Sequence, residues 1–180
     1  MNVPLYTSAE ARARETFLAL MWALSYPGRS KRLSTSSPYA DMGAALLDLE
    51  TSFYTPDAEL ETVLRHTGAR SLPSGRAAYH FYPALTVDHL GELKNASVGT
   101  MQYPDQSATL VIGCTLGQGS TVDLSGAGIQ GVYTITIGGI PAEFWTLRQQ
   151  IIRYPLGWDI FLVSGQDVIG IPRSTRIGAK

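Results

Sequence analysis

The chain has 180 residues, of which 44% are hydrophobic, and 14 basic residues nearly balance 15 acidic ones. This length and apolar fraction indicate one folded domain, residues 1–180, and exclude intrinsic disorder. A formal net charge of −1 without a run of basic residues argues against nucleic-acid binding, which depends on clustered cations that release counterions from phosphates.

The sequence also bears on the compartment. The first residues, MNVPLYTS, lack the basic and apolar regions of a signal peptide, and no stretch reaches the length of a membrane span. The one cysteine, Cys114, cannot form a disulfide within the chain and lies in an apolar run, which indicates a small buried thiol. We therefore expect a cytoplasmic protein that does not contact a membrane.

An N-terminal helix is predicted from Thr7 and Glu10, which match a capping box, and from apolar residues at helical spacing that stop before Pro27. The segment 29–38, rich in serine and basic residues, predicts a surface loop. A second amphipathic helix is predicted over residues 42–49.

Thr55 and Pro56 predict the start of a third helix, with Thr55 as its N-cap, and Gly68 suits its end. The second half of the chain is richer in strands. Strands are predicted at residues 77–82, 108–115, 121–124, 132–137, 158–163 and 168–171, and a helix is predicted at residues 141–152. Helices mixed with apolar strands predict an α/β protein built as α/β/α layers around a mixed sheet.

The C-terminal stretch, residues 154–177, predicts a β-hairpin that is buried on both faces and carries the polar segment 173–176 at its mouth. Asp159 lies inside the otherwise apolar first strand. An unpaired buried carboxylate costs several kcal/mol by order of magnitude, so Asp159 requires a nearby donor or cation. Arg173 and Arg176 are the obvious candidates.

This hairpin closes a series of shorter motifs that occur in a fixed order along the chain. They are MWALSYPG at 21–28, His66-Thr67, Gly99-Thr100, Pro104-Asp105, ATLV at 108–111 and LSGAGI at 124–129. In order and spacing, the set resembles the H subunit of the bacterial carbon–phosphorus lyase system, the PhnH family, which takes part in phosphonate breakdown.

The resemblance implies a fold like the large domain of pyridoxal-phosphate-dependent transferases, without the cofactor. A Schiff base to that cofactor requires a lysine in a desolvated pocket. The three lysines, Lys31, Lys94 and Lys180, lie in a polar loop, near a helix end and at the C-terminus, so we expect no pyridoxal phosphate and no other cofactor.

The resemblance also implies partners. It implies work with the G, I and J subunits of the carbon–phosphorus lyase core complex, and a homodimer when the chain is isolated. The G, H and I subunits, with the L protein, convert ATP and a phosphonate into a ribose 1-phosphonate 5-triphosphate. Under this interpretation the chain is a non-catalytic subunit that stabilises or positions the catalytic one.

The residues themselves predict no catalytic centre. The segment 126–131 matches G-x-G-x-x-G, but a β-branched stretch follows it where a dinucleotide fold needs a helix. The histidines, His66, His80 and His89, lack metal-ligand spacing, so we expect no metal. Neither a nucleophile elbow nor a P-loop is present.

An alternative hypothesis makes the chain a ligand-binding or catalytic component. Arg148, Arg153, Arg173 and Arg176 make the C-terminal third more basic. Guanidinium groups suit phosphate oxygens, so Arg173 and Arg176 beside Asp159 predict a cleft for a nucleotide or a phosphonate. Free amides at the helix start after Gly138-Gly139 would add an anion site. The same arginines also fit an ion-pair network that fixes the hairpin, and whether the chain is an enzyme stays open here.

Overall fold

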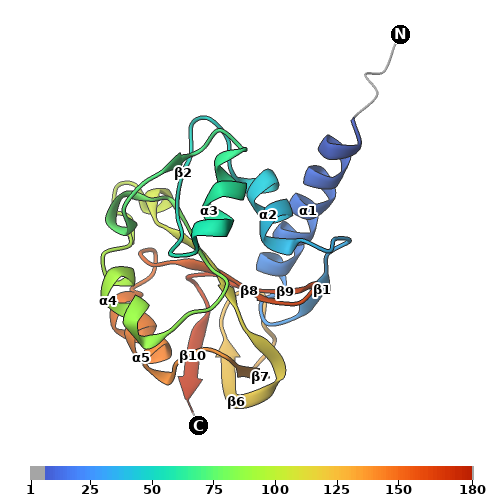
Figure 1. The fold of residues 1–180 in the computed structure, drawn as a ribbon. Coiled ribbons are helices and arrows are strands. Elements are labelled where there is room, and N and C mark those ends of the chain that lie inside the picture. Colours follow the sequence, from blue (N-terminus) through green and yellow to red (C-terminus); the bar gives the residue numbers. More distant parts are fainter. Residues whose placement is uncertain (1–6, 180) are drawn as a thin grey trace.

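The computed structural model describes residues 7–179, so the N-terminal MNVPLY segment and Lys180 lie outside it. Its centre is a seven-stranded mixed sheet (Figure 1). The strands lie in the order β1 (Ser30–Arg32), β9 (Asp167–Ile171), β8 (Asp159–Ser164), β5 (Thr109–Gly113), β4 (Tyr79–Tyr82), β2 (Ser52–Tyr54) and β3 (Arg70–Ser71). Neighbours from β8 to β3 run parallel, whereas β9 is antiparallel to both β8 and β1. The predicted α/β fold with a mixed sheet is confirmed.

Helices and a second sheet cover this large sheet. On one face lie α1 (Ser8–Ser25), α2 (Pro38–Leu46) and α3 (Ala58–Arg65) (Figure 1). On the other lie α4 (Leu90–Leu93), α5 (Ala142–Ile151) and a small antiparallel sheet of β10 (Arg176–Ala179), β6 (Thr115–Ser125) and β7 (Tyr133–Gly138). Short 3-10 turns are η1 (Ser74–Arg76), η2 (Val87–His89) and η3 (Pro104–Gln106).

The inner positions of the central strands β5 and β8 are apolar because both faces of these strands are covered. Leu110 and Ile112 of β5 point into the core beneath α4, α5 and the small sheet, and Val111 between them points into the core beneath α1, α2 and α3. In β8, Ile160 points into the core beneath α4, α5 and the small sheet, and Phe161 points into the core beneath α1, α2 and α3. The predicted hairpin, β8 with β9, is thus confirmed as buried on both faces.

The predicted start of α1 is confirmed, and the predicted start of α3 is wrong. Thr7 Oγ1 accepts a hydrogen bond from the backbone N–H of Glu10 at 3.2 Å, which completes the capping box. In α3 the N-cap is Asp57, whose carboxylate accepts from the Leu60 N–H at 2.9 Å. Thr55 instead accepts from the Asp57 N–H at 3.2 Å, which forms a turn before the helix.

The segment 29–38 is not wholly a loop, because it contains β1. This strand pairs antiparallel with β9 at the edge of the large sheet, with Lys31 opposite Val168. Its three side chains are exposed, so it needs no apolar alternation in the sequence. A short edge strand that carries charge resists unwanted pairing with other chains.

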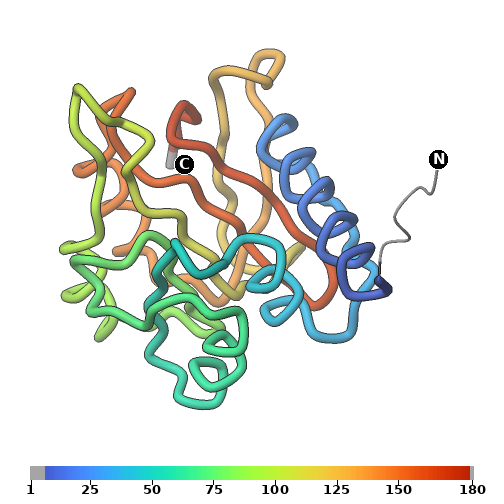
Figure 2. Tube along the Cα trace, turned by 90° about the horizontal axis from the view of Figure 1, so that it is seen from above, coloured from blue at the N-terminus to red at the C-terminus, as the bar shows by residue number. Residues whose placement is uncertain are grey.

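Helix α1 lies directly against β9, and Figure 2 shows it running alongside this strand. The close approach occurs at Gly170. A Cβ atom at this position would lie 2.5 Å from the backbone carbon and oxygen of Ala23 in α1. Because these are backbone atoms, no side-chain rotation relieves the overlap.

We therefore expect Gly170→Ala to lower the free energy of unfolding by about 1–3 kcal/mol, because α1 must shift away from the sheet. Denaturant unfolding measures the change. Gly91→Ala in α4 is the matched control, since a Cβ there meets nothing within 4 Å, and we expect it to be neutral or slightly stabilising. Equal stability of the Gly170→Ala and wild-type proteins would contradict this packing.

Candidate functional site

An arginine-lined cleft of about 740 Å³ opens between the end of α5, the loop from β6 to β7 and the turn that joins β9 to β10. This volume lies within the range of small-molecule sites. The cleft is lined by Gly126, Ala127, Arg148, Gln149, Ile152, Tyr154, Arg173, Ser174, Thr175, Arg176 and Ile177.

The turn after β9 brings the predicted arginines to this cleft. Pro172 ends β9, and its carbonyl accepts from the Thr175 N–H at 2.9 Å, which closes the turn. At Arg176 the chain enters β10 and joins the small sheet opposite Ser125. The turn therefore passes from one sheet to the other across the end of α5.

Asp159 and Arg173 form the predicted pair. The Asp159 carboxylate accepts from Arg173 Nη2 at 2.5 Å, from Nε at 3.2 Å and from the Arg173 backbone N–H at 2.9 Å. Arg173 Nη1 also donates to the Pro104 carbonyl. Arg173 thus ties together β8, the turn and the η3 segment, and most of its donors are occupied. Arg176 is exposed and does not bond Asp159 in the described part of the chain.

Arg148 is the least expected group in the cleft wall. Its side chain is only 2% exposed, and its Nη2 donates to the carbonyls of Pro172 and Thr175 at 3.2 and 3.1 Å. Its Nε has no hydrogen-bond partner among the described residues, and neither has Oγ1 of Thr175, which is also 2% exposed. Burial lowers the pKa of the Arg148 guanidinium to about 10, although the negative charge of Asp159 acts in the opposite direction and raises it.

The sequence places Arg148 only in a basic region. Its spacing from the apolar residues of α5, however, indicates that its side chain is buried. Phe144 and Leu147 lie on the buried face of α5. Arg148 follows Phe144 by four residues, so it must share that face. An arginine at a core position of an amphipathic helix indicates a buried cation, and buried cations require compensation.

Gly138 and Gly139 do not line this cleft. They precede the N-terminus of α5, whereas Arg148 is in its last turn, roughly 10 Å farther along at 1.5 Å per residue. The two parts of the predicted anion site therefore lie apart.

The glycine-rich segment 126–131 takes part in the cleft as a strand connection. It leads from β6 to β7 with positive φ at Gly126, Gly128 and Gly131. A Cβ at Gly126 would lie 2.8 Å from the Ser174 carbonyl oxygen. The missing side chain therefore lets this loop close the cleft against the turn.

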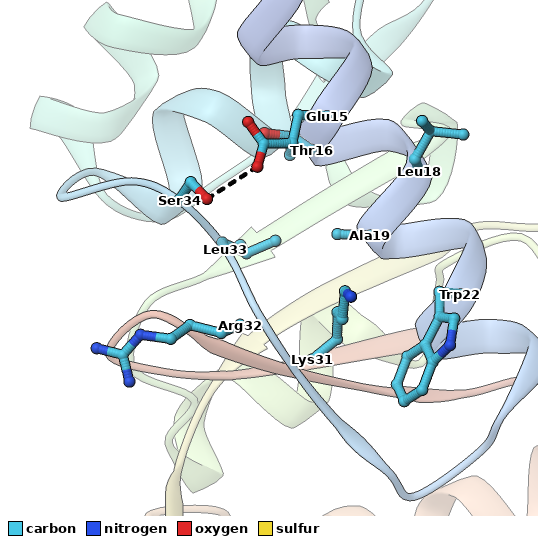
Figure 3. A pocket seen from close by; sticks show the side chains of 9 residues that line it. All are labelled: Glu15, Thr16, Leu18, Ala19, Trp22, Lys31, Arg32, Leu33 and Ser34. Atoms are coloured by element: carbon cyan, nitrogen blue, oxygen red, sulfur yellow. Dashed lines mark hydrogen bonds between the residues drawn. The ribbon is translucent and has the colours of Figure 1, made fainter.

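A smaller hollow of about 360 Å³ lies between α1 and the β1 segment (Figure 3). The Ser34 hydroxyl donates to the Glu15 carboxylate at 2.9 Å across it, and Lys31 Nζ lies 5.4 Å from the centre of the Trp22 ring. Leu18, at 56% exposure, stands on its α1 side. Its lining mixes apolar side chains, such as Leu18 and Trp22, with the charged groups of Glu15, Lys31 and Arg32.

The side chain of His80 in β4 is also completely buried. Its ring packs against those of Tyr54 and Tyr82, whose centres lie 5.8 and 6.2 Å from it and 6.0 Å from each other. Its Nε2 is 3.2 Å from the Ala77 carbonyl, and its Nδ1 has no partner in the described chain. Burial lowers the pKa of His80 from its ordinary 6.5 to about 4.

Residues 7–179 also bear on metal binding and on insertion into a membrane. No group of three or more His, Cys, Asp or Glu residues in this range is arranged to hold a metal ion. No helix in this range has the length and hydropathy needed to cross a membrane.

A double-mutant cycle measures the Asp159–Arg173 pair. Because both side chains are about one-fifth exposed and share several hydrogen bonds, we expect Asp159→Asn and Arg173→Gln to show a coupling energy of about 1–2 kcal/mol in unfolding experiments. The exposed Glu61–Arg65 pair in α3 is the control, with an expected coupling below about 0.5 kcal/mol. Equal coupling in the two pairs would refute a central role for Asp159.

His80 should make stability depend on pH. The unfolded chain binds a proton near pH 6.5 and the folded chain only near pH 4, so unfolding becomes easier as the pH falls between these values. We expect His80 to contribute a loss of about 3 kcal/mol in unfolding free energy from pH 7 to pH 4. His80→Phe should flatten the measured profile by this amount, and an unchanged profile would show that His80 is not buried in its neutral form.

Comparison of the sequence with known proteins assigns the chain to a family. The family model described as "Bacterial phosphonate metabolism protein (PhnH)" matches residues 4–178. A putative C-P lyase subunit protein, HtxG, of Stutzerimonas stutzeri is 31% identical over 181 residues, which cover 94% of this chain and 87% of that protein. An alpha-D-ribose 1-methylphosphonate 5-triphosphate synthase subunit, PhnH, of Rhizobium meliloti (strain 1021) is 29% identical over 185 residues, covering 92% and 90%. The chain therefore belongs to the PhnH family.

Proposed function

We propose that this chain is a non-catalytic assembly subunit of a cytoplasmic carbon–phosphorus lyase core complex. Its role is to support the formation of a ribose 1-phosphonate 5-triphosphate from ATP and a phosphonate. Both relatives named above are described as subunits of phosphonate-processing enzymes, which supports a role within a complex. As further parts of the proposal, the partners are the G, I and J subunits, and the backbone has the fold of the large domain of pyridoxal-phosphate-dependent transferases.

The observation that carries the proposal is an apolar face on the outside of α1. This α1 apolar face consists of Phe17, Leu18, Met21, Trp22 and Tyr26. Four of these side chains are 41–56% exposed, and Trp22 is half-buried with its ring 4.9 Å from that of Tyr26.

The opposite side of the same helix is already used in the core. Leu20 and Ala23 are fully buried beneath it. An amphipathic helix of a monomeric protein normally turns polar residues to water, whereas a helix that is apolar on both sides is covered on both sides. Only the second half of α1 is apolar outside, because residues 8–15 are mostly polar or charged there. The exposed face is thus a defined surface rather than a general property of the helix.

Aromatic residues and methionine are the types enriched where proteins meet, and charges at the edge of such a contact fix its orientation. Lys31 and Arg32 of β1 border the α1 apolar face through the hollow in Figure 3. In the complex this surface contacts a neighbouring subunit. In the isolated protein the same surface pairs with a second copy, which gives the proposed homodimer.

The test is co-purification of a tagged chain with co-expressed G, I and J subunits. We expect the wild-type chain to recover them and the variant Leu18→Glu/Met21→Glu to recover roughly tenfold less or worse, because central apolar contacts dominate interface energy. Light scattering of the isolated proteins should give a dimer for wild type and a monomer for the variant.

Val87→Glu serves as the control, because Val87 has the same exposure as Leu18, 55% against 56%, but lies next to α4. It should leave both the recovery and the dimer unchanged, and thermal unfolding checks that all variants fold. Recovery of none of the three subunits by the wild-type chain would end the assembly proposal. Normal recovery by the double variant would remove α1 from it.

A further inference from the structure

The charges of the arginine-lined cleft do not balance. Its described lining contains Arg148, Arg173 and Arg176 and no acidic residue. Asp159 is the acid whose charge acts on Arg148, yet its carboxylate is already bonded by Arg173. Arg148 is therefore a buried cation whose direct partners are carbonyl dipoles alone.

Such a group is costly to keep. The free energy that a guanidinium loses on leaving water is recovered only when an opposite charge and a full set of hydrogen bonds surround it. Among the described residues, Nε of Arg148 has no hydrogen-bond partner, and neither has Oγ1 of Thr175 in the same turn. Both atoms lie behind the cleft wall and are closed to solvent, so an anion seated in the cleft would compensate Arg148 through its charge rather than by a direct hydrogen bond.

We propose that this cleft binds a small anion that carries a phosphate or phosphonate group, with Arg176 as the direct ligand and Arg148 as the buried counter-charge beneath it. Arg176 is exposed, has no side-chain hydrogen bond in the described chain and can turn its planar fork toward tetrahedral oxygens. Arg173 keeps its bonds to Asp159 and sets the position of the turn.

The shape of the site favours a small ligand over an acidic side chain of another protein. The cationic floor lies within a concavity, and an anion seated there is partly removed from water, which strengthens its attraction to Arg148. The neighbouring shallow hollow contains Asp105 together with the Asp159–Arg173 pair, so it offers an anion less positive charge than the wall at Arg148 and Arg176. Tyr154, 73% exposed at the rim, offers a ring on which an attached organic group can lie.

Calorimetric titration of the isolated protein at low ionic strength tests the proposal with three probes: sodium tripolyphosphate, ATP and methylphosphonate. We expect saturable binding of at least one of them that weakens as salt is added. Equal affinity for tripolyphosphate and ATP would identify the phosphate chain as the recognised group. Tighter binding of ATP would add a contact to the nucleoside, and binding of methylphosphonate alone would assign the site to the phosphonate.

Two variants locate the binding. Arg176→Ala changes an exposed side chain and should weaken binding at least tenfold without affecting folding. Arg148→Gln removes the buried charge and retains an amide, although this shorter side chain does not reach as far as Nη2 toward the Pro172 and Thr175 carbonyls. In the folded variant we expect a similar loss of binding. Arg70→Ala, an exposed arginine on the far edge strand β3, is the control and should bind like wild type.

Absence of heat with all three probes would overturn the proposal, and so would wild-type affinity in Arg176→Ala. An equal loss in Arg70→Ala would reduce the effect to general charge attraction and also contradict the site. Because the titration uses the isolated chain, its outcome is independent of whether the chain assembles with other subunits.

Discussion

The ion pair between Asp159 and Arg173 is the interaction on which the C-terminal half of the molecule depends. Asp159 begins β8, a strand at the centre of the large sheet, and the pair fixes the turn after β9 to it. Through the Pro104 carbonyl, the same guanidinium holds the η3 segment. A carboxylate at this depth is costly when unpaired, so the pair selects one position of the turn. That position brings Thr175 and Arg176 to the end of α5.

The charge of the cleft depends on which arginine the Asp159 carboxylate bonds. If Asp159 faced Arg148, the buried charge in α5 would be neutralised and the cleft would be an ordinary polar depression. Because Asp159 bonds Arg173 instead, Arg148 keeps a positive charge at low dielectric, where its field reaches farther than at the surface. The arrangement stabilises the fold and leaves an attraction for anions as its consequence.

The sequence predicts the long, periodic and apolar elements well and the short polar ones poorly. The apolar runs of β5 and β8, the capped helix α1 and the Asp159–Arg173 pair follow from residue patterns, because burial and capping act locally. β1 and β3 are short and exposed, and they exist through pairing with distant strands, which no local pattern encodes. For the same reason, the sequence predicts only some of the residues that line the cleft. Arg173 and Arg176 stand out in the hairpin, whereas Arg148 becomes part of the site only when α5 packs beside the turn.

Strand β9 connects the α1 apolar face with the arginine-lined cleft. At Gly170 it touches α1, whose outer side is the α1 apolar face, and two residues later Pro172 begins the turn that forms the cleft. The core beneath α1 lies on one face of the large sheet, whereas the cleft lies on the other face. Helix α1 therefore meets the cleft by two routes: β9 at Gly170, and the 126–131 loop, where a Cβ at Gly128 would lie 2.9 Å from the Ser25 carbonyl oxygen.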